Sequence, residues 1–200
     1  PQLEHLTFRM IFDWMGEHLA SLGSKKIFFN AISAQYLDVN ELRSLHPCYE
    51  EISHNMVFEI IETATSEDGL ARKIRELRSQ VAAFIAIDDF GCAHSNALRL
   101  LNISPEILKI DSFFIRSIHK APAAKKEFLS NILVYCRSKG ILTVAEGVET
   151  HEELASVIAM GFDLAQGFYL ARPNFALQDL APAQVEEISV LTAAFGASSD

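Results

Sequence analysis

Side chains that carry a carboxylate or a carboxamide stand at the end of several short apolar runs of this chain, which we expect to be strands. They are Asn30, Glu59, Asp88, Asp89 and Glu146. Because an unpaired buried carboxylate is costly, a group of them at strand ends indicates that a metal ion or a substrate compensates their charge. Carboxylate and carboxamide oxygens without nearby histidine or cysteine ligands favour a hard cation such as Mg²⁺, Mn²⁺ or Ca²⁺.

The adjacent pair Asp88-Asp89 can serve two ions, with one aspartate bridging them. Two ions about 3.5–4 Å apart stabilise both the entering and the leaving oxygen of an in-line attack on a phosphodiester. Lys109, at a neighbouring strand end, can hold the attacking water or neutralise the negative charge that develops on the phosphorane. The residue types therefore predict metal-assisted phosphodiester chemistry.

Each of these residues also has a structural interpretation. A single Asp or Glu at a strand end commonly caps the helix that follows. Asn30 can be a turn residue, and Lys109 with Asp111 can form a rim ion pair of little energetic weight. The placement of such groups on several consecutive strands favours the functional interpretation.

The elements that position these groups alternate between strands and helices. Strands are expected over 27–32, 56–61, 82–87, 107–110, 142–145 and 164–170, and helices over 3–22, 40–45, 67–79, 96–101, 122–139, 152–160 and within 176–195. This alternation predicts an α/β fold with parallel strands and right-handed crossovers. Functional groups at many strand ends favour a TIM-like (β/α)₈ barrel over an open doubly wound sheet. With about six βα units, the barrel is expected to be incomplete.

The composition excludes some functions. The 200 residues carry a formal net charge of −9, which argues against a duplex nucleic acid as partner. Cys48, Cys92 and Cys136 are odd in number and dispersed, so we expect no disulfide framework and a reducing, cytoplasmic location. No apolar run is long enough to span a membrane. The chain begins at Pro1 without a methionine, so we expect a longer parent protein that could be membrane-anchored.

Six ordered segments resemble the EAL domain family of cyclic-di-GMP phosphodiesterases. They are Phe29-Asn30-Ala31-Ile32-Ser33, Phe58-Glu59-Ile60-Ile61-Glu62, Ile87-Asp88-Asp89-Phe90-Gly91, Leu108-Lys109-Ile110-Asp111, Ala145-Glu146-Gly147-Val148-Glu149-Thr150 and Gln166-Gly167-Phe168 to Pro173. The resemblance implies a modified (β/α)₈ barrel that converts cyclic di-GMP to pGpG with two Mg²⁺ or Mn²⁺ ions in bacterial signalling. It also implies a homodimer, with other signalling domains upstream in the parent chain.

The resemblance also assigns roles to residues of this chain. Asn30, Glu59 and Asp88 would hold the first ion, and Asp88, Asp89 and Glu146 the second. Lys109 looks like the lysine that contacts the nucleophilic water, so the implied catalytic residues are Lys109, Glu146 and Asp89. Those implied to bind substrate or support the site are Glu62, Asp111, Glu149, Gln166 and Pro173.

Two departures from the family pattern leave a second function open. The Glu-Ala-Leu strand should lie well before Asn30, and Glu4-His5-Leu6 falls instead at the start of the first helix. The loop that usually reads Phe-Gly-Thr-Gly-Tyr-Ser-Ser here reads Phe90-Gly91-Cys92-Ala93-His94-Ser95-Asn96. The alternative is therefore an inactive EAL module that acts as a cyclic-di-GMP receptor or a protein-interaction domain.

We expect a barrel lacking its first strands over residues 1–176 and a C-terminal helix with a frayed tail over 177–200. As an isolated fragment, this piece is expected to be inactive even if the parent protein is a phosphodiesterase.

Overall fold

The computed structural model describes residues 2–31, 39–60, 72, 74, 75, 78, 84–91, 97–174 and 178–196. Two compact units divide the chain: unit 1 comprises Pro1–Asp88 with His94–Ile107, and unit 2 comprises Asp89–Ala93 with Leu108–Asp200. Among the described residues, no helix combines the length and the apolar character needed to cross a membrane.

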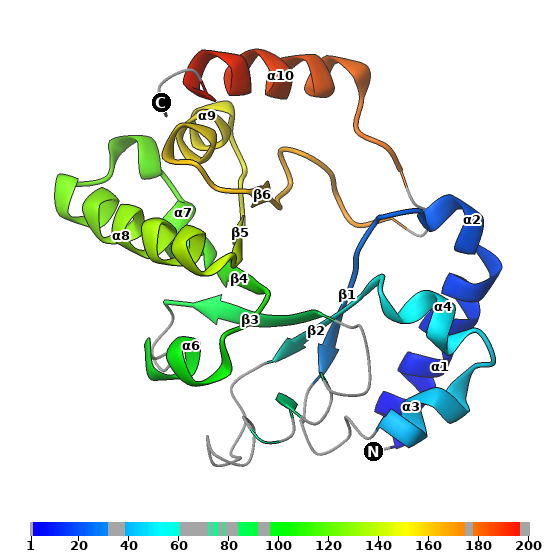
Figure 1. Ribbon diagram of the computed structural model, residues 1–200. Helices are drawn as coiled ribbons and strands as arrows, with labels where there is room; N and C mark the ends of the chain where they lie inside the picture. The colour runs from blue at the N-terminus through cyan, green and yellow to red at the C-terminus, as the bar shows by residue number, and fades with distance from the viewer. Residues whose placement is uncertain are drawn as a thin grey trace. The chain divides into compact units, whose positions relative to one another are not determined.

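The helices and strands follow one another in nearly strict alternation (Figure 1). In chain order they are α1 Gln2–Glu17, α2 Leu19–Leu22, β1 Ile27–Ala31, α3 Val39–Leu45, α4 Tyr49–Ser53, β2 Met56–Ile60, β3 Phe84–Phe90, α6 Ala97–Ile103, β4 Ile107–Ile110, α7 Ser112–Ile115, the 3₁₀ helix η2 Ile118–Lys120, α8 Ala123–Lys139, β5 Leu142–Ala145, α9 His151–Met160, β6 Leu164–Ala165 and α10 Pro182–Gly196.

The strands form one sheet in the order β1-β2-β3-β4-β5-β6. The pairs β1/β2, β2/β3 and β5/β6 are parallel. A doubly wound sheet reverses its strand order at a switch point, whereas consecutive order is typical of a barrel wall. The fold is therefore an α/β incomplete TIM-like barrel, as the sequence predicts.

An aromatic core holds β1 and β2 in unit 1. Phe8 and Phe12, one turn apart on α1, have ring centroids 6.2 Å apart. Phe8 lies edge-on to Phe29 of β1 and to Phe58 of β2, with centroid distances of 6.3 and 6.1 Å. Such spacing is favourable for aromatic pairs. This core anchors the two strands that end near Asn30 and Glu59.

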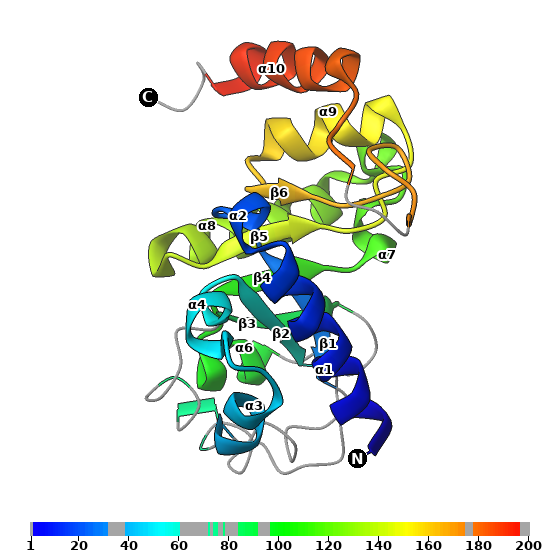
Figure 2. The same cartoon turned by 90° about the vertical axis from the view of Figure 1, so that its right-hand side faces the viewer.

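In unit 2, α8 and α9 end as the sequence predicts. Gly140 and Gly161 follow the two helices in the left-handed conformation, with φ of 69° and 81°. The side of α8 that carries Leu129, Leu133 and Cys136 is buried. Helix α10 lies along α9 in both views (Figures 1 and 2).

Two expected elements are shorter than predicted. The helix expected over 3–22 is interrupted at His18, whose φ of −107° and ψ of 13° separate α1 from α2. The strand expected over 164–170 is confined to Leu164–Ala165. Beyond it the backbone turns, because the amides of Leu170 and Ala171 both donate to the carbonyl of Gly167.

Polar residues tie the amino-terminal ends of alternate strands. Asn55, which precedes β2, accepts the amide of Ile27 and donates to the carbonyls of Gly23 and Lys25. Glu106, which precedes β4, accepts the amide of Ile85 at 2.8 Å.

Asp163, which precedes β6, binds the amino-terminal end of β5 in the same way. Its Oδ2 accepts both the amide and the hydroxyl of Thr143, at 2.8 and 2.7 Å. These contacts stabilise the end of the sheet opposite the carboxyl ends, where barrels place their functional groups.

Candidate metal and phosphodiester site

Three predicted ligands in unit 1 share one face of the sheet. Asn30 and Glu59 are register partners on β1 and β2, and Glu59 is in turn the partner of Ala86 on β3. Since side chains on a strand alternate between faces, Asp88 lies on the same face as Ala86. Glu59 is buried and Asn30 is exposed. The strand register therefore aligns Asn30, Glu59 and Asp88.

The backbone of Asp89 breaks the alternation of β3. Its φ is 53°, in the left-handed region that Asp and Asn enter more readily than other residues with a side chain. In a regular strand Asp88 and Asp89 would point to opposite faces. Here one carboxylate oxygen from each of Asp88, Asp89 and Glu146 lies within 4.8 Å of the others. The positive φ explains how two consecutive aspartates can serve the same cluster.

Lys109 is the cationic partner within this group. Its Nζ lies 2.7 Å from Oε1 of Glu146, and the two side chains are 5% and 15% exposed. Lys109 lies in β4, and Glu146 directly follows β5, where its amide donates to the carbonyl of Ile110. Adjacent strand ends thus bring together two residues that the sequence places in separate segments.

Asp111 caps the short helix that follows β4. It is the N-cap of α7, and its carboxylate accepts the amide of Phe113 at 2.7 Å. The structure thus gives Asp111 a capping role, where the sequence also allowed an ion pair with Lys109.

Glu149 lies on the surface of the loop after β5. Its carboxylate is 3.5 Å from Nη2 of Arg116, with both side chains exposed. An ion pair in water contributes little to stability. The backbone amide of Glu149 also donates to the carboxylate of Glu153 at 2.8 Å.

Glu153 organises this loop and was not singled out from the sequence. Its buried carboxylate accepts the amides of Ser117, Glu149 and Thr150, at 2.7, 2.8 and 3.2 Å. Thr150 returns a bond by accepting the amide of Glu153, which completes a capping box. The Thr-x-x-Glu spacing before α9 was the signal that would have identified it.

The segment after β6 is bonded to the loop after β5. The backbone of Gln166 donates to Ala145 at 2.8 Å and accepts from Val148 at 3.0 Å, while its side chain is exposed. Gly167 approaches so closely that a Cβ there would lie 2.1 Å from the carbonyl oxygen of Val148. Pro173 is exposed. Glu62 and the Cys92–Asn96 part of the altered loop lie outside the described residues.

The donor set fits a hard divalent cation. Carboxylate oxygens converge from Asp88, Asp89 and Glu146, and among the described residues this cluster includes no histidine nitrogen or cysteine sulfur. Three carboxylates so close together repel one another unless positive charge compensates them. Lys109 supplies one positive charge, so a divalent ion would complete the balance.

The family assignment follows from comparison with known sequences. The sequence profile of the EAL domain matches residues 2–173. The chain belongs to the EAL domain family. It is 31% identical over 135 residues to the cyclic di-GMP phosphodiesterase PdeF of Escherichia coli strain K12, a match that covers 67% of this chain and 18% of PdeF. The chain thus spans less than a fifth of the length of that relative.

Two solved EAL structures share the fold. A standalone versatile EAL protein from Vibrio cholerae O395, in its c-di-GMP bound form, has a TM-score of 0.73 at 29% identity, over 88% of this chain and 77% of that one. BlrP1 of Klebsiella pneumoniae, in a manganese/cy-diGMP complex, has a TM-score of 0.73 at 27% identity, over 86% of this chain and 44% of that one. Both similarities agree with the barrel described above.

Proposed function

We propose that this EAL domain belongs to a phosphodiesterase that hydrolyses cyclic di-GMP to pGpG. The observation that carries the proposal is the convergence of Asp88, Asp89 and Glu146 beside the buried Lys109. The relatives support the substrate, since PdeF is named a cyclic di-GMP phosphodiesterase and two similar structures are described as bound to c-di-GMP. In the reaction, water adds to one phosphorus atom and the bond from that phosphorus to the 3′ oxygen breaks.

In this proposal the complete site of the parent protein would bind two Mg²⁺ or Mn²⁺ ions. Asn30, Glu59 and Asp88 hold one, and Asp88, Asp89 and Glu146 hold the other. Bound ions of this kind lower the pKa of water and stabilise the entering and leaving oxygens. The register of β1, β2 and β3 supports the first set, and the carboxylate cluster supports the second.

Lys109 orients the attacking water and offsets the negative charge of the transition state. Its ammonium is held by Glu146 at 2.7 Å and is nearly excluded from solvent, which keeps the charge in one position and strengthens its field. Lys109, Asp89 and Glu146 are the catalytic residues of this proposal.

The remaining predicted residues support the site in this proposal. Glu62 would order the loop after the two aspartates, Glu149 and Asp111 would have supporting roles, and Gln166 and Pro173 would line the site from the segment after β6. The N-cap at Asp111 and the backbone bonds of Gln166 support these roles.

A homodimer is also part of the proposal. The side chain of Phe113 is 69% exposed, and it lies beside Phe114, which stacks on the exposed Phe128. A Cβ at Gly91, just after the two aspartates, would meet the ring of Phe114. An exposed aromatic patch of this kind is suited to a protein interface. Four further expectations stay predictions: the barrel over residues 1–176, the helix and tail over 177–200, the upstream signalling domains and the cytoplasmic location.

The second candidate is an inactive module that binds cyclic di-GMP or a protein partner. The altered loop favours it, because Ala93 stands where the family usually has a glycine and has less access to positive φ. The two candidates differ in product formation rather than in ligand binding.

The deciding experiment is incubation of the full-length parent protein with cyclic di-GMP and Mn²⁺, followed by chromatography for pGpG. We expect pGpG to form, and to disappear when EDTA is added. Micromolar binding without product would overturn the enzyme proposal and leave the receptor. The 200-residue fragment serves as a comparison and is expected to be inactive.

A further inference from the structure

Glu187, on α10, contacts residues of two different loops. Its Oε1 accepts the hydroxyl of Tyr169 at 2.9 Å and lies 2.5 Å from Nδ1 of His151. Tyr169 belongs to the segment after β6, and His151 is the first residue of α9, which follows the loop after β5. One carboxylate therefore joins the loops that follow two adjacent strands.

Gln184 adds a second anchor one turn earlier on α10. Its Nε2 donates to the carbonyls of Tyr169 and Leu170, at 2.8 and 2.9 Å. Its Oε1 accepts the amide of Ala181, just before the helix begins. The first half of α10 is thus bonded to the backbone and to a side chain of the same segment.

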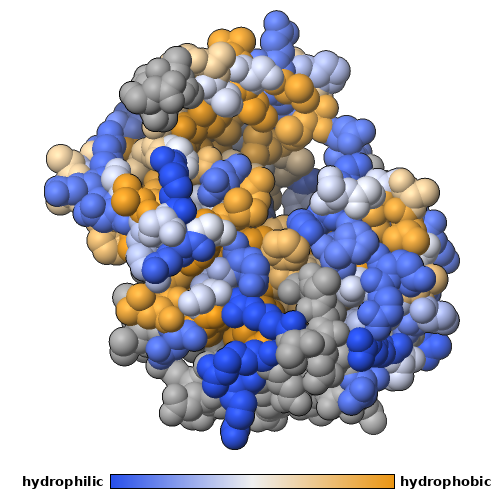
Figure 3. Space-filling view, viewed as in Figure 1, coloured by the Kyte–Doolittle hydropathy of each residue, from blue (hydrophilic) through white to orange (hydrophobic). Residues whose placement is uncertain are grey.

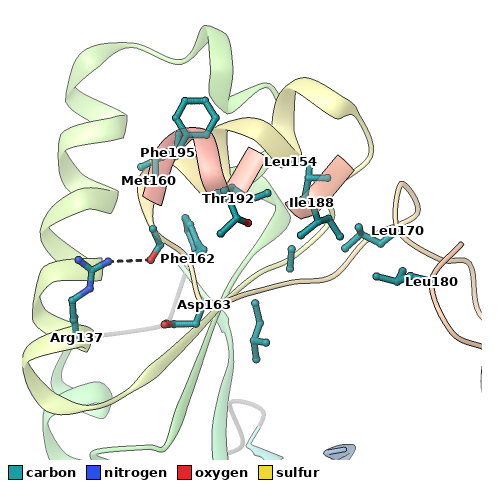
Figure 4. Close-up of a pocket in the computed structure, with 15 residues that line it drawn as sticks. Arg137, Leu154, Met160, Phe162, Asp163, Leu170, Leu180, Ile188, Thr192 and Phe195 are labelled. Carbon is teal, nitrogen blue, oxygen red and sulfur yellow. Dashed lines mark hydrogen bonds between the residues drawn. The ribbon is translucent and has the colours of Figure 1, made fainter. Parts of the chain in front are cut away.

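A pocket adjoins the second half of α10. Its volume is about 500 Å³, and it is lined by Ile188, Thr192 and Phe195 of α10 and by Leu154 and Leu170 among others (Figure 4). Hydrophobic residues also gather on the outer surface in this part of the molecule (Figure 3). Side chains that line a pocket have fewer packing partners there, so the hydrogen bonds of Gln184 and Glu187 contribute to holding α10 in position.

The electrostatics of the three side chains agree with this geometry. Hydrogen bonds, first from His151 and then from Tyr169, hold the pKa of the Glu187 carboxyl below its usual value. The bond to Glu187 raises the pKa of the Tyr169 hydroxyl. Near neutral pH, therefore, the carboxylate is ionised and the tyrosine keeps its proton.

These loops lead directly to the candidate site. The amide of Tyr169 donates to the carbonyl of Val148, and the amide of Val148 donates to the carbonyl of Gln166. A shift of Tyr169 is therefore transmitted through the backbone to Gln166 and to the loop that begins at Glu146.

We propose that Glu187 is a positioning residue, which locks the segment after β6 onto the loop after β5 and so fixes Gln166 relative to Glu146. The consequence for nucleotide binding rests on the proposed function. The coupling between the two loops is independent of the proposed function, because it requires neither metal nor nucleotide.

Hydrogen exchange measured by mass spectrometry tests the coupling. We expect Glu187→Ala to speed exchange roughly fivefold or more in peptides covering 147–151 and 166–171, while α8 keeps its parental rate. The matched control is Glu186→Ala, which removes the exposed carboxylate next to it on the same helix and should change neither region. Parental exchange in Glu187→Ala would overturn the proposal.

Two conservative variants distinguish the positioning of the segment after β6 from a general loss of protein stability. Glu187→Gln keeps an oxygen that can accept the hydroxyl of Tyr169, so it should restore part of the protection. Tyr169→Phe removes only that hydroxyl and nearly conserves the side-chain volume, so the chain should still fold and should reproduce the faster exchange of 166–171. Equal effects of Glu187→Gln and Glu187→Ala on that segment would contradict the role of the Tyr169 contact.

Kinetics of the active parent protein provide the functional readout. We expect Glu187→Ala to raise the KM for cyclic di-GMP roughly fivefold and to change kcat less, because the lost contact positions a binding segment. Faster exchange with an unchanged KM would overturn the link to substrate. If the parent forms no pGpG, the proposed function fails, and the exchange experiment still decides whether Glu187 couples the loops.

Discussion

Lys109 and Glu146 form a nearly buried ion pair, with Nζ and Oε1 2.7 Å apart. They come from β4 and from the residue after β5, so two separate strands must be in place for the pair to form. Removing one member of a buried pair leaves the other charge without compensation, which costs much more than the intact pair contributes. The stability of this part of the fold should therefore depend on both residues.

Lys109→Met should lower the free energy of unfolding by about 3 kcal/mol in the presence of EDTA. Methionine keeps much of the length of the apolar stem but leaves Glu146 and the two aspartates without the ammonium. Urea denaturation followed by circular dichroism measures the loss. In Lys109→Met/Glu146→Gln most of the stability should return while turnover stays absent. If the double variant is no more stable than the single one, the uncompensated charge is not the cause.

Asp89→Asn should abolish hydrolysis of cyclic di-GMP and leave the fold intact. Asparagine tolerates the left-handed conformation that φ of 53° requires, so the unfolding free energy should change by less than about 1 kcal/mol. Loss of a ligand charge should weaken Mn²⁺ binding roughly tenfold or more, as measured by calorimetry.

Asp89→Ala is the matched variant for backbone conformation. It removes the ligand oxygen altogether, whereas asparagine keeps a neutral amide oxygen, and it adds a cost of roughly 1–2 kcal/mol for holding alanine at positive φ. Asp89→Ala should therefore bind Mn²⁺ no more tightly than Asp89→Asn and should be the less stable of the two. Hydrolysis at the parental rate in Asp89→Asn would refute the assignment of Asp89 to the metal site.

The fold could be predicted because its signals are local. Alternating apolar runs and helical stretches, with Gly140 and Gly161 as stop signals, indicated parallel βα units, and the strand order agrees. The boundaries at His18 and after Ala165 could not be predicted, since they depend on backbone turns that the apolar pattern does not encode.

The site was predictable as a set of residue types but not as a geometry. Strand-end position indicated that Asp88, Asp89 and Glu146 could act together, and their oxygens lie within 4.8 Å of one another. The positive φ of Asp89 and the Lys109–Glu146 pair depend on tertiary structure. The capping box of Glu153 is a local signal, but its bond to the amide of Ser117 depends on tertiary structure and could not be predicted.

Gly167→Ala should displace the segment that carries Gln166. Its Cβ would lie 2.1 and 2.3 Å from the oxygen and nitrogen of Val148, and a backbone neighbour cannot rotate away. We expect a loss of about 2–3 kcal/mol in unfolding free energy and weaker binding of cyclic di-GMP. Gly140→Ala is the control, because Gly140 has φ of 69° and no atom within 4 Å of the added Cβ. It should cost about 1–2 kcal/mol and leave binding unchanged. Equal binding in the two variants would contradict the role of the Gly167 approach.

Cys136 should be inert towards thiol reagents in the folded protein. Burial, and secondarily the charge of Asp163, raises the pKa of this thiol to about 11. Since the thiolate is the reactive form, iodoacetamide at pH 8 should leave Cys136 unmodified until urea unfolds the chain, as peptide mass spectrometry would detect. The half-buried Cys48 provides an internal comparison.

The same shift predicts how stability changes with pH. The unfolded thiol ionises near its ordinary pKa of about 8.5, whereas the folded one keeps its proton up to about pH 11. Between these values the folded state binds more protons, so the contribution of Cys136 to stability falls as the pH rises. The free energy of unfolding, measured by urea titration at pH 8, 9 and 10, should therefore fall more steeply with pH for the parent than for Cys136→Ala. Parallel curves, or alkylation of the native thiol at pH 8, would mean that Cys136 is accessible to water.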